Sequence, residues 1–434
     1  MIETLSLILV GLIGLVLAGM ILVNPFLGIV LIAASLPVTD LLPSIPMVSS
    51  ILPVVGGITI FGYLMKNVNK HGNGVKGTRS VVILGLLFII WMFITNPQAA
   101  WFGIDRNWIF TYGQLLILTF LAEELLDDPK KYKTFLWVFS IVAVISATVA
   151  IQQGSIGEDI DTSIRTGGLS EGANSAGRYF VVGMIFFVYL RTMEQNQLLR
   201  FISGLGILIT FLGVFYTVSR TSMVLLFTAI GLIILLNPQK KLNFTLIVVF
   251  MAGILLLTFL SDTVFKILGS IIPAITQGTD TIGLRYKLWD AGFRMWQDHP
   301  ITGVGIGMYR HELPFYAIGI PQHYLHLVAH STYVQLLSET GIVGLGLWLT
   351  MAAISLRNLW KASRIDDLEL RSLATVWFIV LVIMLIGGIT MTQSAEKLIW
   401  ICMGVSEYFH LHVLNQPATK EVQKLGLRVA VKTE

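Results

Sequence analysis

Residues 81–94 read VVILGLLFIIWMFI, an uninterrupted apolar run without a single charged side chain. Similar runs recur along the chain, and many approach the ~20 residues that a helix needs to cross a bilayer. Of the 434 residues, 55% are hydrophobic and only 12% are charged, which is about half the charged share of soluble domains. The sequence therefore predicts an all-α integral membrane protein.

The apolar runs predict about twelve transmembrane helices. The run at 5–23 has no basic segment before it and no cleavage site, so it is expected to be a retained helix. Asn24-Pro25 and a series of prolines interrupt the first 65 residues, which are expected to hold two crossings and one broken or re-entrant piece. The other expected spans are 80–96, 108–126, 133–151, 177–192, 201–217, 222–236, 243–260, 331–356, 372–391 and 397–413.

The distribution of Lys and Arg predicts how these helices are oriented. Basic residues collect in alternate connections, and the positive-inside rule assigns such connections to the cytoplasm. Both termini are then cytoplasmic, and the chain divides into a first bundle (1–260), a large outer loop (261–330), three last helices (331–413) and a basic tail (414–434). The other connections expected outside are 97–107, 152–176, the Ser219-Arg220 turn and 392–396.

The outer loop contains an amphipathic helix that is expected over 283–300. Lys287, Asp290, Arg294 and Asp298 share one face, and Leu288, Trp289, Gly292, Phe293, Met295 and Trp296 share the other. Arg285 is exceptional because it falls on the apolar face. It is either a snorkelling or cation–π arginine, or a cation directed inward at a bound anion.

Arg220 lies in a short polar turn between two apolar runs. A charge near membrane depth costs roughly 2.5–3.5 kcal/mol on insertion scales, so such residues usually face a cavity or the bundle interior. The alternative is an interfacial arginine that binds lipid headgroups. We favour a functional role.

Five of the eight histidines fall between His299 and His330. His323, His326 and His330 have a spacing that would place them on one helical face, where they could bind zinc, although no HExxH pattern accompanies them. His330 opens the long helix expected over 331–356, as either a catalytic or an interfacial residue.

Two further patterns are weaker. Asp159 and Asp161 match the D-x-D spacing of metal-dependent glycosyltransferases, but solvated loop acids explain them more simply. The Gly303-Val304-Gly305-Ile306-Gly307 segment lacks the context of a nucleotide-binding loop and is interpreted as a turn.

Taken together, these segments resemble the bacterial O-antigen ligase and polymerase superfamily. The resemblance covers about 283–348, and a further arginine motif lies upstream at Ser219-Arg220-Thr221. One difference lies directly after His330, where this chain has Ser331 and the family often has asparagine. The matching pieces are Gly283-Leu284-Arg285 with Leu288-Trp289, His299-Pro300 with Ile301-Thr302-Gly303-Val304-Gly305, and the segment His330-Ser331-Thr332-Tyr333 through Gly344.

The resemblance implies a GT-C-like membrane glycosyltransferase that works in the bacterial inner membrane, with its active site on the periplasmic face. It implies an undecaprenyl diphosphate-linked glycan as donor, a lipid A–core or glycan acceptor, inversion, and no metal, cofactor or nucleic acid. The implied catalytic residues are Arg220, Arg285 and His330. Arginines can stabilise the leaving diphosphate, and a histidine can accept the proton of the acceptor hydroxyl. The resemblance also implies four substrate-binding residues. Trp289 and Tyr333 lie in the segments quoted above, and Asn174 and Arg178 lie around the start of the expected span 177–192, where Gly167–Gly177 is similar to a family patch of small residues and asparagine.

Three functions remain open at this stage. A ligase, which we favour slightly, and a polymerase that uses a second lipid-linked repeat unit would share these motifs. A lipid-linked glycan flippase is a more distant alternative, because transporters place charges on broken helices at mid-membrane depth.

Overall fold

The computed structural model describes residues 14–42, 51–67, 78–95, 104–154, 166–236 and 281–415. Within these ranges the chain forms helices and turns, and no strand occurs. After a short helix over Gly14–Val23, the elements are α2 (Phe26–Ser35), η1 (Leu36–Leu41), α3 (Leu52–Asn67), α4 (Ser80–Thr95), α6 (Ile104–Leu125), α7 (Pro129–Gln153), α8 (Ala173–Met193), α9 (Gln197–Tyr216), α10 (Arg220–Leu236), α14 (Thr281–Asp298), α15 (Tyr309–Tyr316), η2 (Gln322–Tyr324), α16 (Thr332–Ala362), α17 (Leu368–Gly387), α18 (Lys397–Tyr408) and a final π-helical turn, η3 (Phe409–Leu414).

Polar side chains fix where several of the long helices begin. Asp128 accepts a hydrogen bond from the Lys130 amide at 2.6 Å at the start of α7, and Asp367 accepts one from the Leu370 amide at 2.9 Å at the start of α17. Asn196 and Ser331 cap α9 and α16 in the same way. These residues satisfy amide groups that have no partner within the helix.

The described helices support a membrane protein. Five of them are long and apolar enough to cross a bilayer: α7, α8, α9, α16 and α17. Shorter apolar helices occur at Gly14–Val23, Phe26–Leu41, Ser80–Thr95 and Arg220–Leu236. The helical class is thus confirmed, whereas a total of twelve spans stays a prediction, and the expected span 243–260 lies outside the described residues.

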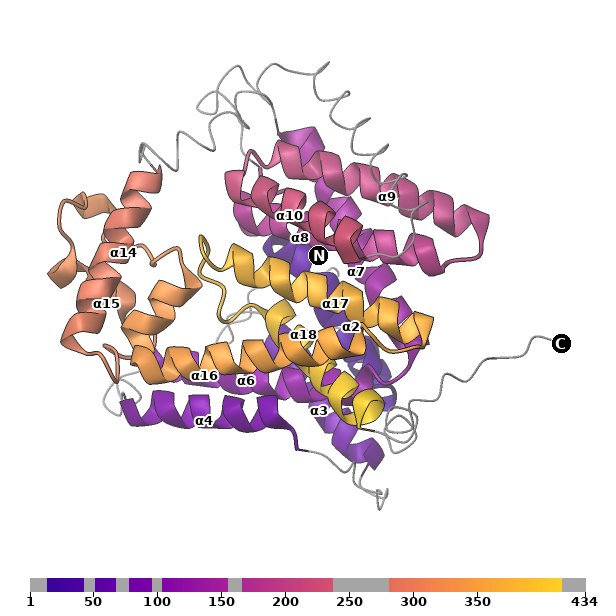
Figure 1. Ribbon diagram of the computed structural model, residues 1–434, viewed down its shortest axis with the longest axis horizontal. Coiled ribbons are helices and arrows are strands. Elements are labelled where there is room, and N and C mark those ends of the chain that lie inside the picture. Colours follow the sequence, from indigo (N-terminus) through magenta and orange to yellow (C-terminus); the bar gives the residue numbers. More distant parts are fainter. Residues whose placement is uncertain are drawn as a thin grey trace, which may run out of the picture.

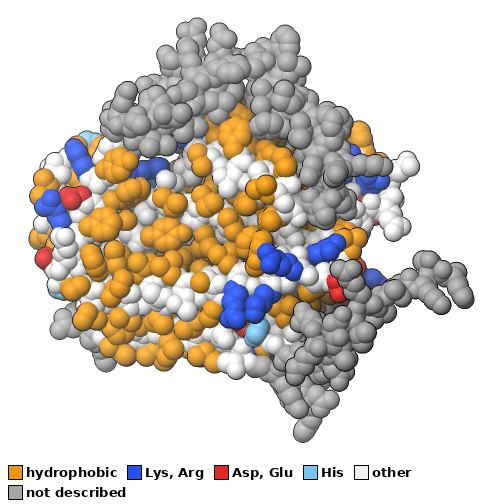
Figure 2. Space-filling view, viewed as in Figure 1, with side chains coloured by type: hydrophobic (Ala, Val, Ile, Leu, Met, Phe, Trp, Pro, Cys, Tyr) orange, Lys and Arg blue, Asp and Glu red, His pale blue; other side chains and the backbone are white. Residues whose placement is uncertain are grey.

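The long helices run roughly along one direction and enclose a single core. In Figure 1, α4, α16 and α17 lie side by side, with α14 and α15 grouped at one end of them. Trp348 of α16, Trp377 of α17 and Trp400 of α18 are fully buried in this core. Figure 2 shows hydrophobic side chains spread over the middle of the visible face, with charged ones gathered toward its edges.

One end of the bundle joins connections that are distant in sequence, and we call it the site end. The Leu169 carbonyl accepts a hydrogen bond from the Asp40 amide at 3.1 Å, and the Trp91 indole donates to the Thr340 carbonyl at 2.9 Å. The Tyr112 hydroxyl donates to Ser394 at 2.8 Å. Several of the segments that the sequence assigns to the outer side therefore meet at the same end.

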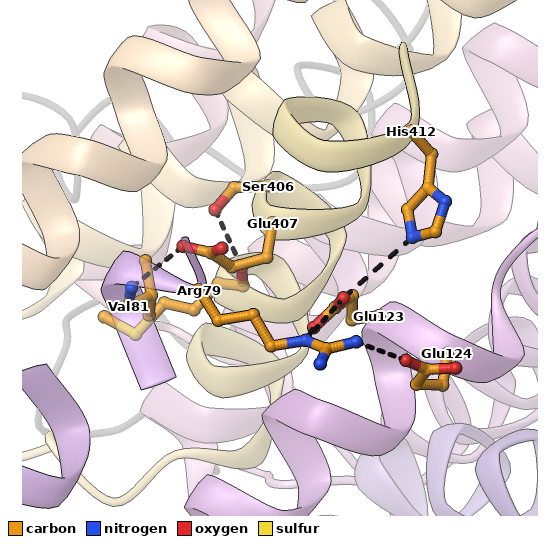
Figure 3. A network of polar contacts seen from close by, with 8 residues as sticks. Arg79, Val81, Glu123, Glu124, Ser406, Glu407 and His412 are labelled. Carbon is orange, nitrogen blue, oxygen red and sulfur yellow. Dashed lines mark hydrogen bonds and ion pairs between the residues drawn. The ribbon is translucent and has the colours of Figure 1, made fainter. Parts of the chain in front are cut away.

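The opposite end carries a buried charge cluster, and we call it the basic end. Arg79 contacts Glu123 at 2.9 Å and Glu124 at 2.5 Å, which ties the start of α4 to the end of α6 (Figure 3). Glu407 of α18 accepts a hydrogen bond from the Val81 amide at 2.8 Å. The cluster therefore fastens three helices together at this end.

Residues 281–330 form a small helical unit against α16. Leu288, Met295, Tyr309 and Leu313 are buried in its own apolar core. The expected amphipathic helix is confirmed as α14, with one correction: Phe293 is 44% exposed rather than part of the buried face. The side chain of Phe293 points away because Leu288, Ala291 and Met295 already fill the contact with α15 and α16.

Candidate active site

His330 occupies a strained position directly before α16. Its backbone φ is +48°, a left-handed conformation that is uncommon for any residue but glycine. The next residue, Ser331, begins α16 by accepting a hydrogen bond from the Val334 amide at 3.4 Å. Such strain costs of order 1–3 kcal/mol and persists only where surrounding contacts enforce it.

The contacts that enforce this conformation are made by the backbone carbonyl and amide of Ala329, the residue before His330. The Trp289 indole of α14 donates to the Ala329 carbonyl at 2.9 Å, and the Ala329 amide donates to the Gln335 side chain at 2.9 Å. Gln335 in turn donates to Glu339 at 2.5 Å. Trp289, Gln335 and Glu339 thus hold the histidine turn.

Positive charge surrounds the His330 ring. The imidazole is half-buried, and burial lowers its pKa below the ordinary 6.5, with further lowering by Arg285 and then by Arg310 of α15. The ring is therefore neutral at physiological pH and able to accept a proton. Arg310 went unnoticed in the sequence because it belongs to a short helix with no distinctive motif.

Helix α16 is broken at Gly341, about three helical turns after His330. Gly341 has φ +65° and ψ −171°, so α16 consists of two helical parts rather than the single expected helix over 331–356. The segment 300–305 fits against the break: the Ile342 amide donates to the Pro300 carbonyl at 3.0 Å and the Gly305 amide to the Glu339 carbonyl at 2.9 Å. A Cβ on Gly341 would collide with the Ile301 carbonyl, which is why this position requires glycine.

The glycine segment that superficially resembles a nucleotide loop is a turn. Gly303, Gly305 and Gly307 all have positive φ, and a Cβ on Gly303 would collide with the backbone of Glu339. The segment is therefore shaped by its packing against α16.

Arg220 begins α10 from a second strained turn. Val218 has φ +48°, and Ser219 donates to the Asn174 side chain at 2.7 Å while accepting from the Ser222 hydroxyl at 2.8 Å. Asn174 thus holds this turn from the start of α8. Among the residues that the structure describes, the half-buried Arg220 guanidinium has no ion pair and no hydrogen-bond partner.

The connection between α17 and α18 brings the two turns together. Thr221 and Thr390 share a hydrogen bond at 3.1 Å, on the arginine side. On the histidine side, the Thr332 amide donates to the Gly388 carbonyl and the Thr332 hydroxyl to the Met391 carbonyl, both at 2.8 Å. The turns that carry Arg220 and His330 are therefore both bonded, through Thr221 and Thr332, to the same short stretch, 388–391.

Arg178 and Tyr333 contact the protein itself. Arg178 is buried, donates to Gln393 at 2.5 Å and pairs with Glu396 at 2.8 Å, so it fastens the 388–396 connection to α8. The Tyr333 hydroxyl donates to the Leu385 carbonyl of α17 at 2.6 Å. Their predicted contact with substrate stays a prediction, and these bonds show a positioning role for both.

The possible metal ligands do not assemble within the described chain. His323 belongs to the 3₁₀ turn η2, and residues 325–331 are not helical, so the expected shared helical face of the three histidines is wrong. Across the described ranges, no group of three or more His, Cys, Asp or Glu could hold a metal ion. Asp159 and Asp161 lie outside the described residues.

Comparison with known families agrees with the location of the site. Residues 205–349, about a third of the chain, match the family model described as O-antigen ligase. This stretch includes Arg220, Arg285 and His330. No curated protein matches the chain.

Proposed function

We propose, from the match of residues 205–349 to the O-antigen ligase family model, that this protein is a membrane glycosyltransferase that transfers a lipid-linked glycan to an acceptor hydroxyl. The single observation that carries the proposal is that Thr221, next to Arg220, and Thr332, two residues after His330, both hydrogen-bond to the stretch 388–391. Arg220, a cation with no ion pair or hydrogen bond among the described residues, and the neutral imidazole of His330 suit the two ends of a glycosyl transfer. One stabilises a leaving anion, and the other accepts a proton.

The donor in this proposal is a glycan on undecaprenyl diphosphate. As the sugar–diphosphate bond breaks, negative charge develops on the leaving phosphate, and fixed cations can stabilise it. Arg220 and Arg285 are our candidates for this role, because a guanidinium can make two parallel hydrogen bonds to phosphate oxygens. Arg220 also stands at the first turn of α10, where the helix dipole favours an anion.

The acceptor hydroxyl in this proposal is activated by His330. The lowered pKa keeps the ring in the form that can remove a proton. The acceptor oxygen then attacks the anomeric carbon from the face opposite the diphosphate, so the linkage is inverted. Neither metal nor cofactor takes part in this scheme.

An apolar cavity of about 320 Å³ supports a polyprenyl donor. It lies between α2, α3 and α6, and Ala395 and Lys397 close it at the site end. Its walls include Ile32, Leu52, Ile60, Leu118 and Leu121. We propose that part of the isoprenoid tail occupies this cavity, with Lys397 near the diphosphate.

Ligase and polymerase remain two forms of the same proposal, and we favour the ligase with a lipid A–core acceptor. A transport function is less well supported, because Arg220 and Arg285 belong to segments that the sequence assigns to one side of the membrane rather than to broken helices at mid-membrane depth. The protein would act in the bacterial inner membrane, with the site end on the periplasmic face and both termini in the cytoplasm.

Transfer by purified protein tests the proposal. Lipid-diphosphate donor is incubated with either lipid A–core or a second lipid-linked repeat unit, and products are separated by size. His330→Ala should lower the rate 10²–10⁴-fold and Arg220→Ala or Arg285→Ala about 10²–10³-fold. Arg294→Ala is the matched control, since Arg294 lies on α14 in an exposed pair with Asp290. Normal product formation by His330→Ala would end the proposed role of this residue.

A chelator separates the proposal from the metal alternative. Activity should persist in excess chelator. Loss that is restored by added divalent metal would instead favour a role for Asp159 and Asp161.

A further inference from the structure

A second cavity lies at the basic end, away from the candidate active site. It has a volume of about 340 Å³ and opens between the ends of α8 and α10 and the start of α17. Arg371 at its mouth precedes Gly388 by 17 positions, which corresponds to about 25 Å along a helix. The cavity is therefore separate from the stretch that joins Arg220 to His330.

The mouth of this cavity is cationic and polar. Arg364 and Arg371 line it together with Ser363, Ser372 and Thr192. In the described part of the chain neither arginine has a carboxylate partner, and Arg364 instead lies over the Trp360 ring at 4.1 Å.

Among the acidic groups near this mouth, none lines the cavity. Asp367 is engaged in capping α17, and Glu194 pairs with Lys133 at 2.6 Å. Asp366 and Glu369 lie outside the lining, although Glu369 is near enough to interact electrostatically with Tyr189 in the cavity wall. The lining side chains thus carry two positive charges and no negative one.

The inner walls are apolar. Along α8 the lining runs from Thr192 back to Ile185, and along α17 it runs from Arg371 forward to Ile379. At 1.5 Å per residue, these stretches give a slot about 10–12 Å deep. Val188, Ile233 and Val376 contribute apolar wall, and Tyr189 and Thr375 are the polar side chains between them.

We propose that this cavity binds an anionic phospholipid, with the phosphate at Arg364 and Arg371 and part of one acyl chain along the apolar slot. Basic pockets between helices bind such headgroups in membrane proteins generally. A soluble anion would leave the slot empty, and a lipid without net negative charge would leave the arginines uncompensated. A lipid held here would join α8, α10 and α17 at the basic end.

Thermal unfolding of the purified full-length protein in detergent tests this proposal. The added probes are phosphatidylglycerol, phosphatidylcholine and inorganic phosphate. Phosphatidylglycerol should raise the unfolding temperature more than phosphatidylcholine does, and phosphate alone should have little effect. In Arg364→Gln/Arg371→Gln the apparent affinity for phosphatidylglycerol should fall about 10-fold or more, because two charge-assisted hydrogen bonds are lost.

Arg200→Gln is the matched control. Arg200 is exposed at the start of α9, at the same end, and does not line the cavity. This variant should keep the full response to phosphatidylglycerol. An unchanged response in the double variant would overturn the proposal, as would an equal loss in Arg200→Gln or equal stabilisation by inorganic phosphate.

Discussion

His330 combines backbone strain with a neutral ring, and the charges around it predict a pH dependence. Burial, Arg285 and Arg310 all lower the pKa of the ring. A group with a lowered pKa stays neutral until the pH falls below that value. We therefore expect kcat/KM to be maintained down to a pH below 6.5 and to decline only beneath it.

Arg310→Gln tests this origin of the lowered pKa. Removing one nearby positive charge makes protonation of His330 easier, so its pKa rises toward the ordinary value. The acid limb of the pH–rate profile should move to higher pH, with little change on its alkaline side. An acid limb that stays in place in Arg310→Gln would show that His330 does not control it.

We expect Trp289 to position the His330 turn through its indole N–H, and a substitution that keeps the aromatic ring separates this role from packing. Trp289→Phe keeps an aromatic ring but removes the donor to the Ala329 carbonyl, a loss of about 0.5–1.5 kcal/mol. The released histidine turn should lower kcat several-fold with little change in KM. Trp296→Phe is the control, because its indole donates to the Pro300 carbonyl at 3.1 Å on the same helix. Equal effects of the two substitutions on kcat would contradict the proposed role of Trp289.

At the scale of elements, the break in α16 creates the surface against which residues 300–305 pack. Gly341→Ala should destabilise the protein by at least ~1–3 kcal/mol, since alanine resists the left-handed conformation and its Cβ meets the Ile301 carbonyl. Gly346→Ala is the control on the same helix, because no atom lies within 4 Å of its would-be Cβ. Thermal unfolding in detergent compares the two. Equal unfolding temperatures would show that the break tolerates a side chain.

The charge cluster at the basic end gives a second element-scale prediction. Arg79→Ala removes the 2.9 Å partner of the fully buried Glu123 and leaves this carboxylate with His412 at 3.9 Å. Because Arg79 is itself 35% exposed, the loss should lie below the roughly 3–5 kcal/mol that is typical of breaking a fully buried pair. Lys131→Ala removes a partner from an exposed pair with Asp127 and should cost no more than about 1 kcal/mol. A small effect of Arg79→Ala on the unfolding temperature would mean that Glu123 is compensated in another way.

Sequence patterns predicted individual elements well and their contacts poorly. Asp128, Asn196 and Asp367 cap the starts of α7, α9 and α17, and each helix begins four residues before its expected range of 133–151, 201–217 or 372–391. The break at Gly341 was not predicted, because a glycine in an apolar helix also suits close packing. The pairing of Arg178 with Glu396 depends on contacts across more than two hundred residues, which no local pattern encodes.

At the scale of the whole molecule, the distribution of Lys and Arg predicts that the site end faces the periplasm and the basic end faces the cytoplasm. One exposed residue at each end allows a test of this orientation. Cys402 is the single cysteine of the chain and is buried, so an added cysteine supplies the reactive thiol. Gln297 is exposed in α14 at the site end, and Gln195 is exposed between α8 and α9 at the basic end. With the site end outside, a membrane-impermeant maleimide should label Gln297→Cys in intact spheroplasts.

Gln195→Cys should react with the same reagent only after the membrane is opened. The unsubstituted protein, with Cys402 alone, serves as the background. Labelling of Gln195→Cys in intact spheroplasts, with Gln297→Cys protected, would reverse the orientation. It would also place Arg220 and His330 on the cytoplasmic face, where a periplasmic acceptor could not reach them. Because the positive-inside rule and the placement of the site are independent arguments, agreement between them would support both.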